Sequence, residues 1–170
     1  RLHLGFAAPS RAHVDAFWRA GTEAGYASDG EPGPRPEYRN DYYGAFLLDP
    51  DGNSAEAVHH GDVAVGNAVD HLWLRVADVE AATRFYEAVA PFGGFRLRGD
   101  DPGCDQFVGD AGSFTLVPGE PTHDAHIAFP ASDDATVGAF HAALVAAGYR
   151  DNGGPGERPQ YHPGYYGAFV

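Results

Sequence analysis

A long internal repeat is the feature that most constrains how this chain folds. Residues 3–46 and 126–169 align without a gap at an offset of 123, and 22 of the 44 aligned positions are identical. The best-matched stretch reads GEPGPRPEYRNDYYGAF in the first copy and GGPGERPQYHPGYYGAF in the second. Chance does not produce a match of this kind, so the repeat indicates a duplicated structural unit.

A fainter third copy lies between these two. His3, His71 and His126 are each followed by Phe after 14 residues, Ala after 17 and Gly after 22. The pattern predicts a short apolar strand starting at each His, then helices over 10–25, 78–92 and 133–147, each ended by its Gly.

Further strands are expected after each helix. The runs FRLRG, CDQFVG and SFTLV in the middle copy, and YYGAFLL and NSAEAVHH in the first, are typical of strands. Pro-Asp-Gly at 50–52 predicts a hairpin that joins YYGAFLL to NSAEAVHH, with Phe46 opposite Glu56. Each unit therefore reads as a strand, a helix and about three more strands.

Charge and composition exclude several function classes. The net charge is −13, all 11 basic residues are Arg, and no basic cluster occurs, so no nucleic acid and no anionic membrane surface is expected as a partner. No apolar run reaches 18 residues, so no membrane span is expected. Cys104 is the one cysteine, which fits a reducing cytoplasm. The chain has no Met, so its first residue is not expected to be the native start.

The repeated pattern resembles the vicinal oxygen chelate superfamily, which includes glyoxalases, bleomycin resistance proteins and extradiol dioxygenases. The resemblance is carried by His71 with LWLRVADVEAATRFYEAV, by His126 with IAF, and by LDPDGNSAEAV with Glu56. It covers nearly the whole chain and implies an α+β fold, in which repeated βαβββ modules form curled mixed sheets around a cup. It implies no single reaction, because this fold hosts several.

The resemblance also implies a domain organisation. Residues 1–60 are expected to be the closing module of a first domain whose opening module is absent, and 61–70 a linker. Residues 71–170 are expected to hold the opening module and a truncated closing module of a second domain. We hypothesise that 71–119 packs against 3–60, because only this pairing gathers two His and one Glu. The unpaired third unit makes a homodimer a possible state of the protein.

Members of this family that hold a metal use strand histidines and a carboxylate from the closing module. Carried over, the candidate ligands are His3, His71, His126 and Glu56, and Glu56 is also the candidate catalytic residue. The ion would be Fe, Mn, Zn or Ni, and a metal-free site is the alternative. Each His could instead be a satisfied core residue. His59 and His60 are interpreted as solvated.

Residues in the repeated loops are candidates for substrate binding. Strand alternation places Tyr42, and by repeat Tyr165, on the face of Glu56, although a slip of one residue would choose Tyr43 and Tyr166. Arg35 and Arg158 could gate the cup or bind an anionic substrate. The alternative interpretation of these two Arg is a salt bridge that fixes the loop.

Two functions remain open at this stage. The first is a metal-dependent lyase, isomerase or dioxygenase that acts on a small molecule with vicinal oxygens. The second is a metal-free protein that sequesters an aromatic antibiotic, as bleomycin-resistance relatives do, with Tyr-Tyr strands as stacking walls.

Overall fold

The computed structural model describes residues 1–61, 68–98 and 103–170. It divides into two compact units. The first holds Arg1–Val79 and Arg98–Ala125, and the second holds Glu80–Leu97 and His126–Val170. The predicted linker at 61–70 falls mostly on residues 62–67, which lie outside the described residues, and the strand that follows already starts at Val69.

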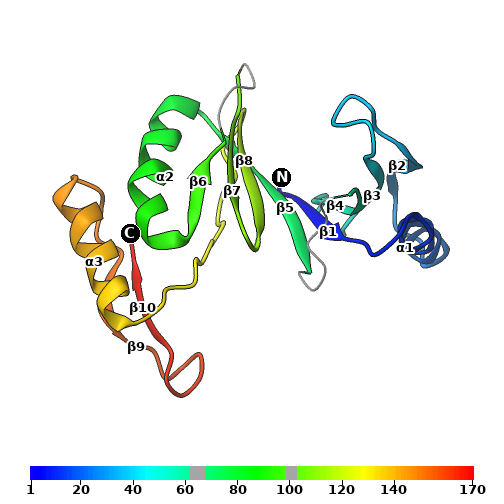
Figure 1. Ribbon diagram of the computed structural model, residues 1–170. Coiled ribbons are helices and arrows are strands. Elements are labelled where there is room, and N and C mark those ends of the chain that lie inside the picture. Colours follow the sequence, from blue (N-terminus) through cyan, green and yellow to red (C-terminus); the bar gives the residue numbers. More distant parts are fainter. Residues whose placement is uncertain (62–67, 99–102) are drawn as a thin grey trace. The chain divides into compact units, whose positions relative to one another are not determined.

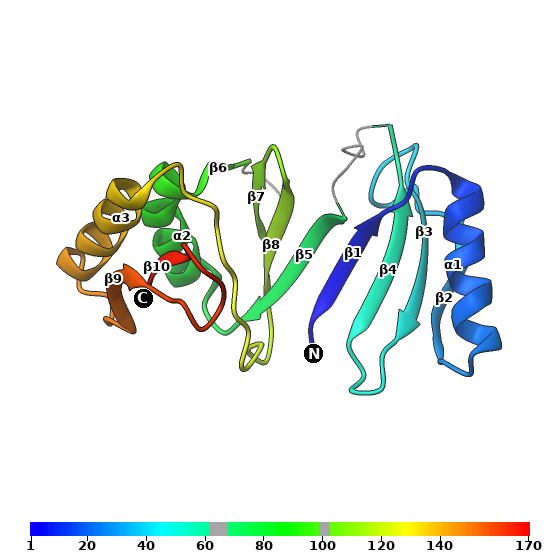
Figure 2. The same ribbon diagram turned by 90° about the horizontal axis from the view of Figure 1, so that it is seen from below.

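The first unit is built on a curled mixed sheet (Figures 1 and 2). Its strands lie in the order β2-β3-β4-β1-β5-β8-β7. Strand β1 pairs in parallel with β4 and antiparallel with β5, and β5 pairs in parallel with β8. This β1–β5 contact joins 71–119 to 3–60, as the ligand chemistry predicted. The elements are β1 (His3–Ala7), α1 (Arg11–Glu23), β2 (Ser28–Pro34), β3 (Tyr43–Leu48), β4 (Ser54–His59), β5 (Val69–Val76), β7 (Asp105–Gly109) and β8 (Gly112–Pro118).

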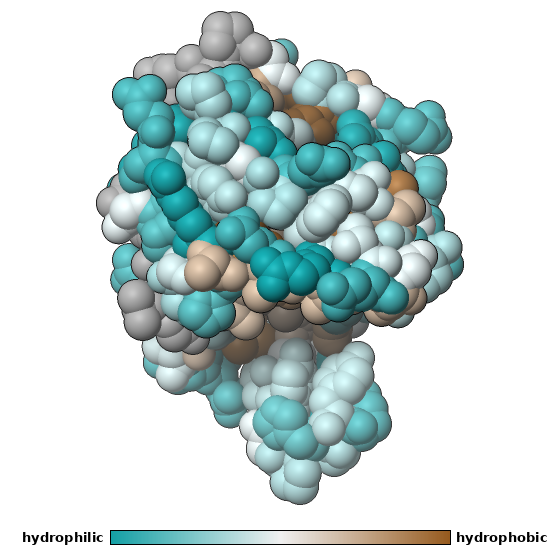
Figure 3. Space-filling view, turned by 90° about the vertical axis from the view of Figure 1, so that its right-hand side faces the viewer, coloured by the Kyte–Doolittle hydropathy of each residue, from teal (hydrophilic) through white to brown (hydrophobic). Residues whose placement is uncertain are grey.

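Helix α1 covers one face of β3 and β4, and this leaves the other face for the cup. Val14 of the helix is fully buried against Ala45 and Ala57, which point toward it. Because side chains alternate along a strand, Phe46 and Glu56 lie on the opposite face. These two residues are paired across the hairpin, as predicted. The outer side, where α1 lies, carries mostly hydrophilic or neutral residues (Figure 3).

The second unit consists of helices and short strands. It contains α2 (Val79–Gly93), β6 (Phe95–Leu97), α3 (Asp134–Ala146), β9 (Gly153–Glu157) and β10 (Tyr166–Phe169). Helix α3 packs on the β9–β10 hairpin and buries Leu144 completely. No helix in the described parts of the chain has the length and apolar character needed to cross a membrane.

All three predicted helices are confirmed, and α1 and α3 end as expected. Gly25 and Gly148 both adopt φ of 92°, the left-handed conformation typical of a residue that follows a helix. After α2 this conformation falls on Gly94 rather than Gly93.

The prediction that each His starts a strand is wrong for two of the three. His3 starts β1, whereas His71 is the third residue of β5 and His126 lies in no strand. The physical reason concerns hydrogen-bond partners. Strand β1 is paired with β4 on one side and with β5 on the other. In the described parts of the chain no strand pairs with the segment HIAF, so its backbone joins no ladder. The assignment of the modules to two domains stays a prediction.

Candidate metal centre

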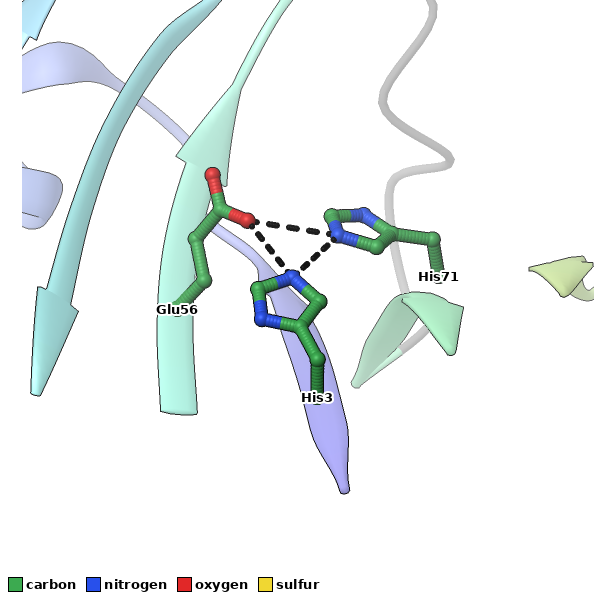
Figure 4. Close-up of side chains that lie close together, drawn as sticks. All are labelled: His3, Glu56 and His71. Atoms are coloured by element: carbon green, nitrogen blue, oxygen red, sulfur yellow. Dashed lines mark hydrogen bonds and ion pairs between the residues drawn. The ribbon is translucent and has the colours of Figure 1, made fainter. Parts of the chain in front are cut away.

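Three side chains from adjacent strands meet on the cup face of the first unit (Figure 4). His3 comes from β1, Glu56 from β4 and His71 from β5. The Nε2 atom of His3 lies 3.1 Å from Oε2 of Glu56 and 3.0 Å from Nε2 of His71. The Nε2 atom of His71 lies 3.2 Å from the same carboxylate oxygen. Three potential ligand atoms therefore form a nearly equilateral triangle.

The size of this triangle fits a divalent ion. Two ligand atoms at about 2.1 Å from one ion are about 3.0 Å apart at a right angle and about 3.4 Å apart at a tetrahedral angle. The observed edges of 3.0–3.2 Å are closer to the right-angled arrangement. Two imidazoles and one carboxylate are the donor set expected for Fe, Mn, Zn or Ni. The residues could therefore hold such an ion on one face of an octahedron.

Two glycines make room for the ligands. A Cβ atom at Gly5 would clash with the ring of His71, and one at Gly44 would clash with the Glu56 carboxylate. Gly5 pairs in the sheet with both His71 and Glu56, whereas Gly44 lies on β3 two residues before Phe46, the residue paired with Glu56. Any larger side chain at Gly5 or Gly44 would push a ligand out of the triangle.

The charges at the triangle are strongly coupled. Burial by itself lowers the pKa of His71, but the carboxylates of Asp70 and Glu56 outweigh it and raise that pKa to about 9. Burial raises the pKa of Glu56, yet hydrogen bonds with His3, His71 and Tyr42 hold it below its usual value. Without an ion, the Glu56 carboxylate is thus negative and the His71 imidazole positive, and a bound cation would replace the positive charge of this imidazole.

Tyr42 fixes the second oxygen of Glu56. Its hydroxyl donates a hydrogen bond of 2.7 Å to Oε1, and the side chain is buried. Burial and the neighbouring Glu56 carboxylate raise the pKa of Tyr42 well above its usual value, so the hydroxyl stays protonated as a donor. The structure thus places Tyr42, and not Tyr43, on the face of Glu56. Tyr43 instead donates to Asp15 of α1.

The sequence analysis missed Asp70, which supports the site from behind. Its Oδ2 atom lies 2.9 Å from Nδ1 of His71, and its Oδ1 atom lies 3.1 Å from Nε2 of His60. A hydrogen bond from Nδ1 of His71 to Asp70 leaves Nε2 facing the triangle. The interpretation of His60 as solvated is wrong, because its side chain is only 10% exposed and stacks on Tyr42. His59 likewise bonds a backbone oxygen, that of Ala8. The sequence signal that could have revealed the role of Asp70 is its position immediately before His71.

The triangle lies in a cavity of about 1210 Å³ within the first unit. Aromatic rings surround the ligands on one side: Trp73 lies 5.0 Å from the ring of His3, and Tyr38 contacts both Trp73 and Tyr42. The cavity is large enough for a small organic molecule. Its wall offers flat apolar surfaces next to the three ligand atoms.

Arg35 lines this cavity, but its guanidinium is engaged in the loop. It donates to the carbonyl oxygens of Glu31 and Pro34 at 2.7 and 3.0 Å and stacks over Phe46. Arg158 makes the same contacts in the second unit, with Gly154, Glu157 and Phe169. Both Arg fix their loops, as the alternative interpretation held, although through carbonyl oxygens and not through a salt bridge.

The remaining candidates, His126 and Tyr165, belong to the second unit. His126 is exposed and places its ring edge-on to Phe169 at 5.7 Å. Tyr165 is half-buried and contacts Tyr161 and His162. Among the described residues, the group that could hold an ion consists of His3, Glu56 and His71 and does not contain His126.

Residues 68–166 match a family model described as the glyoxalase/bleomycin resistance protein/dioxygenase superfamily. The matched range is more than half of the chain and includes β5 with His71. No curated protein sequence matches the chain significantly.

Solved structures show the same fold. Glyoxalase I from Zea mays is 22% identical to this chain. The match covers 92% of this chain and 59% of the maize protein, and the two structures superpose with a TM-score of 0.64. A Mn(II)-bound glyoxalase from Novosphingobium aromaticivorans is 20% identical to this chain, and the match covers 92% of this chain and 55% of that protein with a TM-score of 0.49. The chain thus spans about three fifths of the maize enzyme's length. Likenesses at this identity show the fold alone.

Proposed function

Because the chain belongs to the glyoxalase/bleomycin resistance protein/dioxygenase superfamily, we propose that it is a metal-dependent enzyme acting on a small molecule with vicinal oxygens. The observation that carries the proposal is the triangle of His3, Glu56 and His71, with edges of 3.0–3.2 Å. Two imidazoles and one carboxylate on one face leave further positions for substrate oxygens. Lyase, isomerase or dioxygenase chemistry is compatible with this arrangement.

The three side chains would hold the ion, and their neighbours would keep them in place. Asp70 orients the ring of His71, and Tyr42 holds the carboxylate of Glu56. A bound divalent ion would supply a Lewis acid or redox centre next to the cup. The Glu56 side chain is only 1% exposed, so water screens its negative charge weakly and the carboxylate would attract a cation at the ligand position strongly.

Glu56 serves first as a ligand in this proposal. Its Oε2 atom points at both imidazoles, and its Oε1 atom accepts the Tyr42 hydrogen bond. Both interactions keep the pKa of Glu56 low and make the carboxylate a weak base. A role for Glu56 in moving a substrate proton stays a prediction, and it requires that Tyr42 release Oε1 first.

The substrate would lie in the cup beside the triangle. Trp73 and Tyr38 provide flat surfaces for its carbon skeleton, and the vicinal oxygens would face the ligand atoms. Arg35 shapes the cavity and keeps its loop in position. Tyr165 and Arg158 belong to the second unit, and a role for them in substrate binding stays a prediction.

The test combines metal loading with two probe reactions. Protein purified without chelators is loaded with Fe, Mn, Zn or Ni in turn. Each form is assayed for isomerisation of a thiol adduct of a 2-oxoaldehyde and for oxygen uptake with a catechol. Turnover by at least one form, lost in Glu56→Gln and kept in Glu37→Gln, supports the proposal. Glu37 is the matched control because it lines the same cavity outside the triangle. A protein that takes up no metal and turns over neither probe would contradict it.

A second candidate function is sequestration of an aromatic ligand without chemistry. It is favoured by the aromatic wall of Tyr38, Tyr42 and Trp73. Under this hypothesis, removal of metal leaves the affinity for a flat aromatic ligand unchanged. Under the enzyme proposal, an aromatic ligand with vicinal oxygens loses affinity when metal is removed.

A further inference from the structure

His60 is a largely buried histidine to which the proposed function gives no role. It directly follows β4, and its side chain is only 10% exposed. Its Nε2 atom lies 3.1 Å from Oδ1 of Asp70, whose side chain is 14% exposed. An ionised carboxylate has no proton to donate, so Nε2 of His60 must be the donor of this hydrogen bond. One ring nitrogen of His60 is therefore bound to Asp70.

Asp70 bridges His60 and His71 with its two oxygen atoms. Oδ2 accepts a hydrogen bond of 2.9 Å from Nδ1 of His71, and Oδ1 accepts the one from His60. Burial by itself would raise the pKa of Asp70, but these two hydrogen bonds hold that pKa below its usual value, so the carboxylate stays ionised. The terminal torsion of an Asp side chain is soft, and partners at both oxygens restrict it more than one partner does. The orientation of the His71 ring therefore depends on His60 as well as on Asp70.

Two consecutive residues that precede β3 hold His60 in place. The ring of Tyr42 stacks on the His60 ring, with the centroids 5.8 Å apart. The Oδ2 atom of Asp41 accepts a hydrogen bond of 2.8 Å from the backbone N–H of Gly61, the residue after His60. His60 is thus fixed both through its ring and through the backbone beside it.

Tyr42 connects His60 to a second ligand of the triangle. Its hydroxyl donates to Oε1 of Glu56, while its ring stacks on His60. The stacked pair therefore supports two of the three ligands, because Tyr42 holds Glu56 directly and His60 reaches His71 through Asp70. Tyr42 already has a place in the site, whereas the part played by His60 is new.

We propose that His60 is a positioning residue of the metal centre, which holds Asp70 in the orientation that keeps Nε2 of His71 directed at the ion. The inference rests on the proposed function and extends that site by a residue outside the ligand triangle. A carboxylate on the outer nitrogen of a metal-binding imidazole fixes the ring and makes the ligand atom more basic. Without His60, the Asp70 carboxylate would be free to turn, and the ring of His71 would lose its fixed direction.

The test compares variants of His60 and Asp70 in the full chain. His60→Ala removes the donor, whereas His60→Gln keeps a side-chain N–H of similar reach. Asp70→Ala, alone and combined with His60→Ala, shows whether His60 acts through Asp70. His141→Ala is the matched control, because Nε2 of His141 lies 3.0 Å from Oδ1 of Asp151 in the second unit.

Two measurements are made on each variant. Competition with a chromophoric chelator gives the affinity for zinc. NMR of isotope-labelled histidine in the metal-free protein follows the Nδ1–H proton of His71, which is protected from exchange with water while it is bonded to Asp70. This second measurement reports the direction of the ring and needs neither a metal nor a substrate.

His60→Ala is expected to bind zinc about tenfold more weakly than the parent protein and to lose the His71 proton signal. His60→Gln should recover most of both, and His141→Ala should change neither. Asp70→Ala alone should weaken zinc binding by about 10–100-fold. Adding His60→Ala to Asp70→Ala should weaken binding by less than about twofold more, because the contact through which His60 acts is already gone.

The outcomes separate the role of His60 from the proposed function. A parent protein that binds no zinc contradicts the metal centre, and the proton signal alone then decides whether His60 orients His71. Zinc affinity or a His71 signal in His60→Ala that equals the parent's overturns the proposal. It is also overturned if His60→Ala weakens zinc binding equally with and without Asp70, or if the parent protein shows no protected Nδ1–H proton at His71.

Discussion

The two copies of the repeat share half of their residues, yet they differ in what they contribute. Their elements coincide at the offset of 123: helix α1 at Arg11–Glu23 corresponds to α3 at Asp134–Ala146, and β3 at Tyr43–Leu48 begins where β10 at Tyr166–Phe169 does. Even the arginine contacts agree to within about 0.2 Å, since Arg35 and Arg158 bind equivalent carbonyl oxygens and stack on equivalent rings.

The copies differ where structure depends on distant strands. His3 starts a strand between β4 and β5, whereas His126 lies in no strand. Gly5, which makes room for His71, is replaced by Ala128 in the second copy. Local sequence thus specifies the helix, the hairpin and the arginine contacts. The ligand triangle needs, in addition, neighbours that are far away in the chain.

Exchange of Gly5 and Ala128 gives the largest expected contrast. Gly5→Ala should weaken metal binding at least tenfold and lower the free energy of unfolding by about 1–3 kcal/mol, because the new methyl group overlaps the His71 ring. Ala128→Gly should leave metal affinity unchanged, since Ala128 is exposed. Metal titration and urea unfolding measure both. Normal metal affinity in Gly5→Ala would show that the ring of His71 can move without loss of the site.

Truncation of equivalent helix residues sharpens the comparison of packing. Val14 is fully buried and Val137, its counterpart, is half-buried. Val14→Ala should cost about 2 kcal/mol and Val137→Ala less than about 1 kcal/mol, because the cost depends on the cavity that remains. Hydrogen exchange of the amides of α1 and α3 reports the two effects separately. Equal costs would mean that the two helices are packed equally well.

Removal of the arginine contacts should cost the same stability in both copies of the repeat. Arg35→Ala and Arg158→Ala each remove two hydrogen bonds to loop carbonyl oxygens and one stacking contact, and each should cost about 1 kcal/mol. Thermal unfolding and hydrogen exchange of each hairpin are the measurements. A difference above about 1 kcal/mol between the two variants would contradict the view that these arginine contacts depend only on the local sequence of each hairpin.

The helix starts are expected to differ slightly. Asp133 accepts a hydrogen bond of 2.7 Å from the backbone N–H of Thr136 at the start of α3. Ser10 makes no such bond at the start of α1 and contacts the His13 ring instead. Asp133→Ala should therefore cost about 1 kcal/mol and Ser10→Ala a few tenths. If hydrogen exchange shows that Ser10→Ala loses more stability than Asp133→Ala, then Ser10 and not Asp133 is the stronger helix cap, which contradicts this account.

Local patterns explain what the sequence could predict. The helices follow from apolar periodicity, and the pairing of Phe46 with Glu56 follows from the Pro-Asp-Gly turn. Family resemblance then singled out His3, His71 and Glu56 as candidate ligands. His126 entered this set by its place in the repeat, which says nothing about whether a partner strand is present.

The surroundings of the site could not be predicted in the same way. Asp70 and His60 are separated by the linker, and their contact with each other and with His71 depends on how β4, β5 and the following turns pack. Such contacts depend on tertiary structure and leave no periodic signal in the chain.

Metal stoichiometry in two histidine variants tests the central claim most directly. The claim is that the ion is bound by His3, His71 and Glu56, and that the repeat counterpart His126 is not a ligand. Elemental analysis after loading and dialysis should give about one metal per chain for the parent protein and for His126→Ala, and close to none for His3→Ala. Retention of metal by His3→Ala, or its loss from His126→Ala alone, would contradict the account.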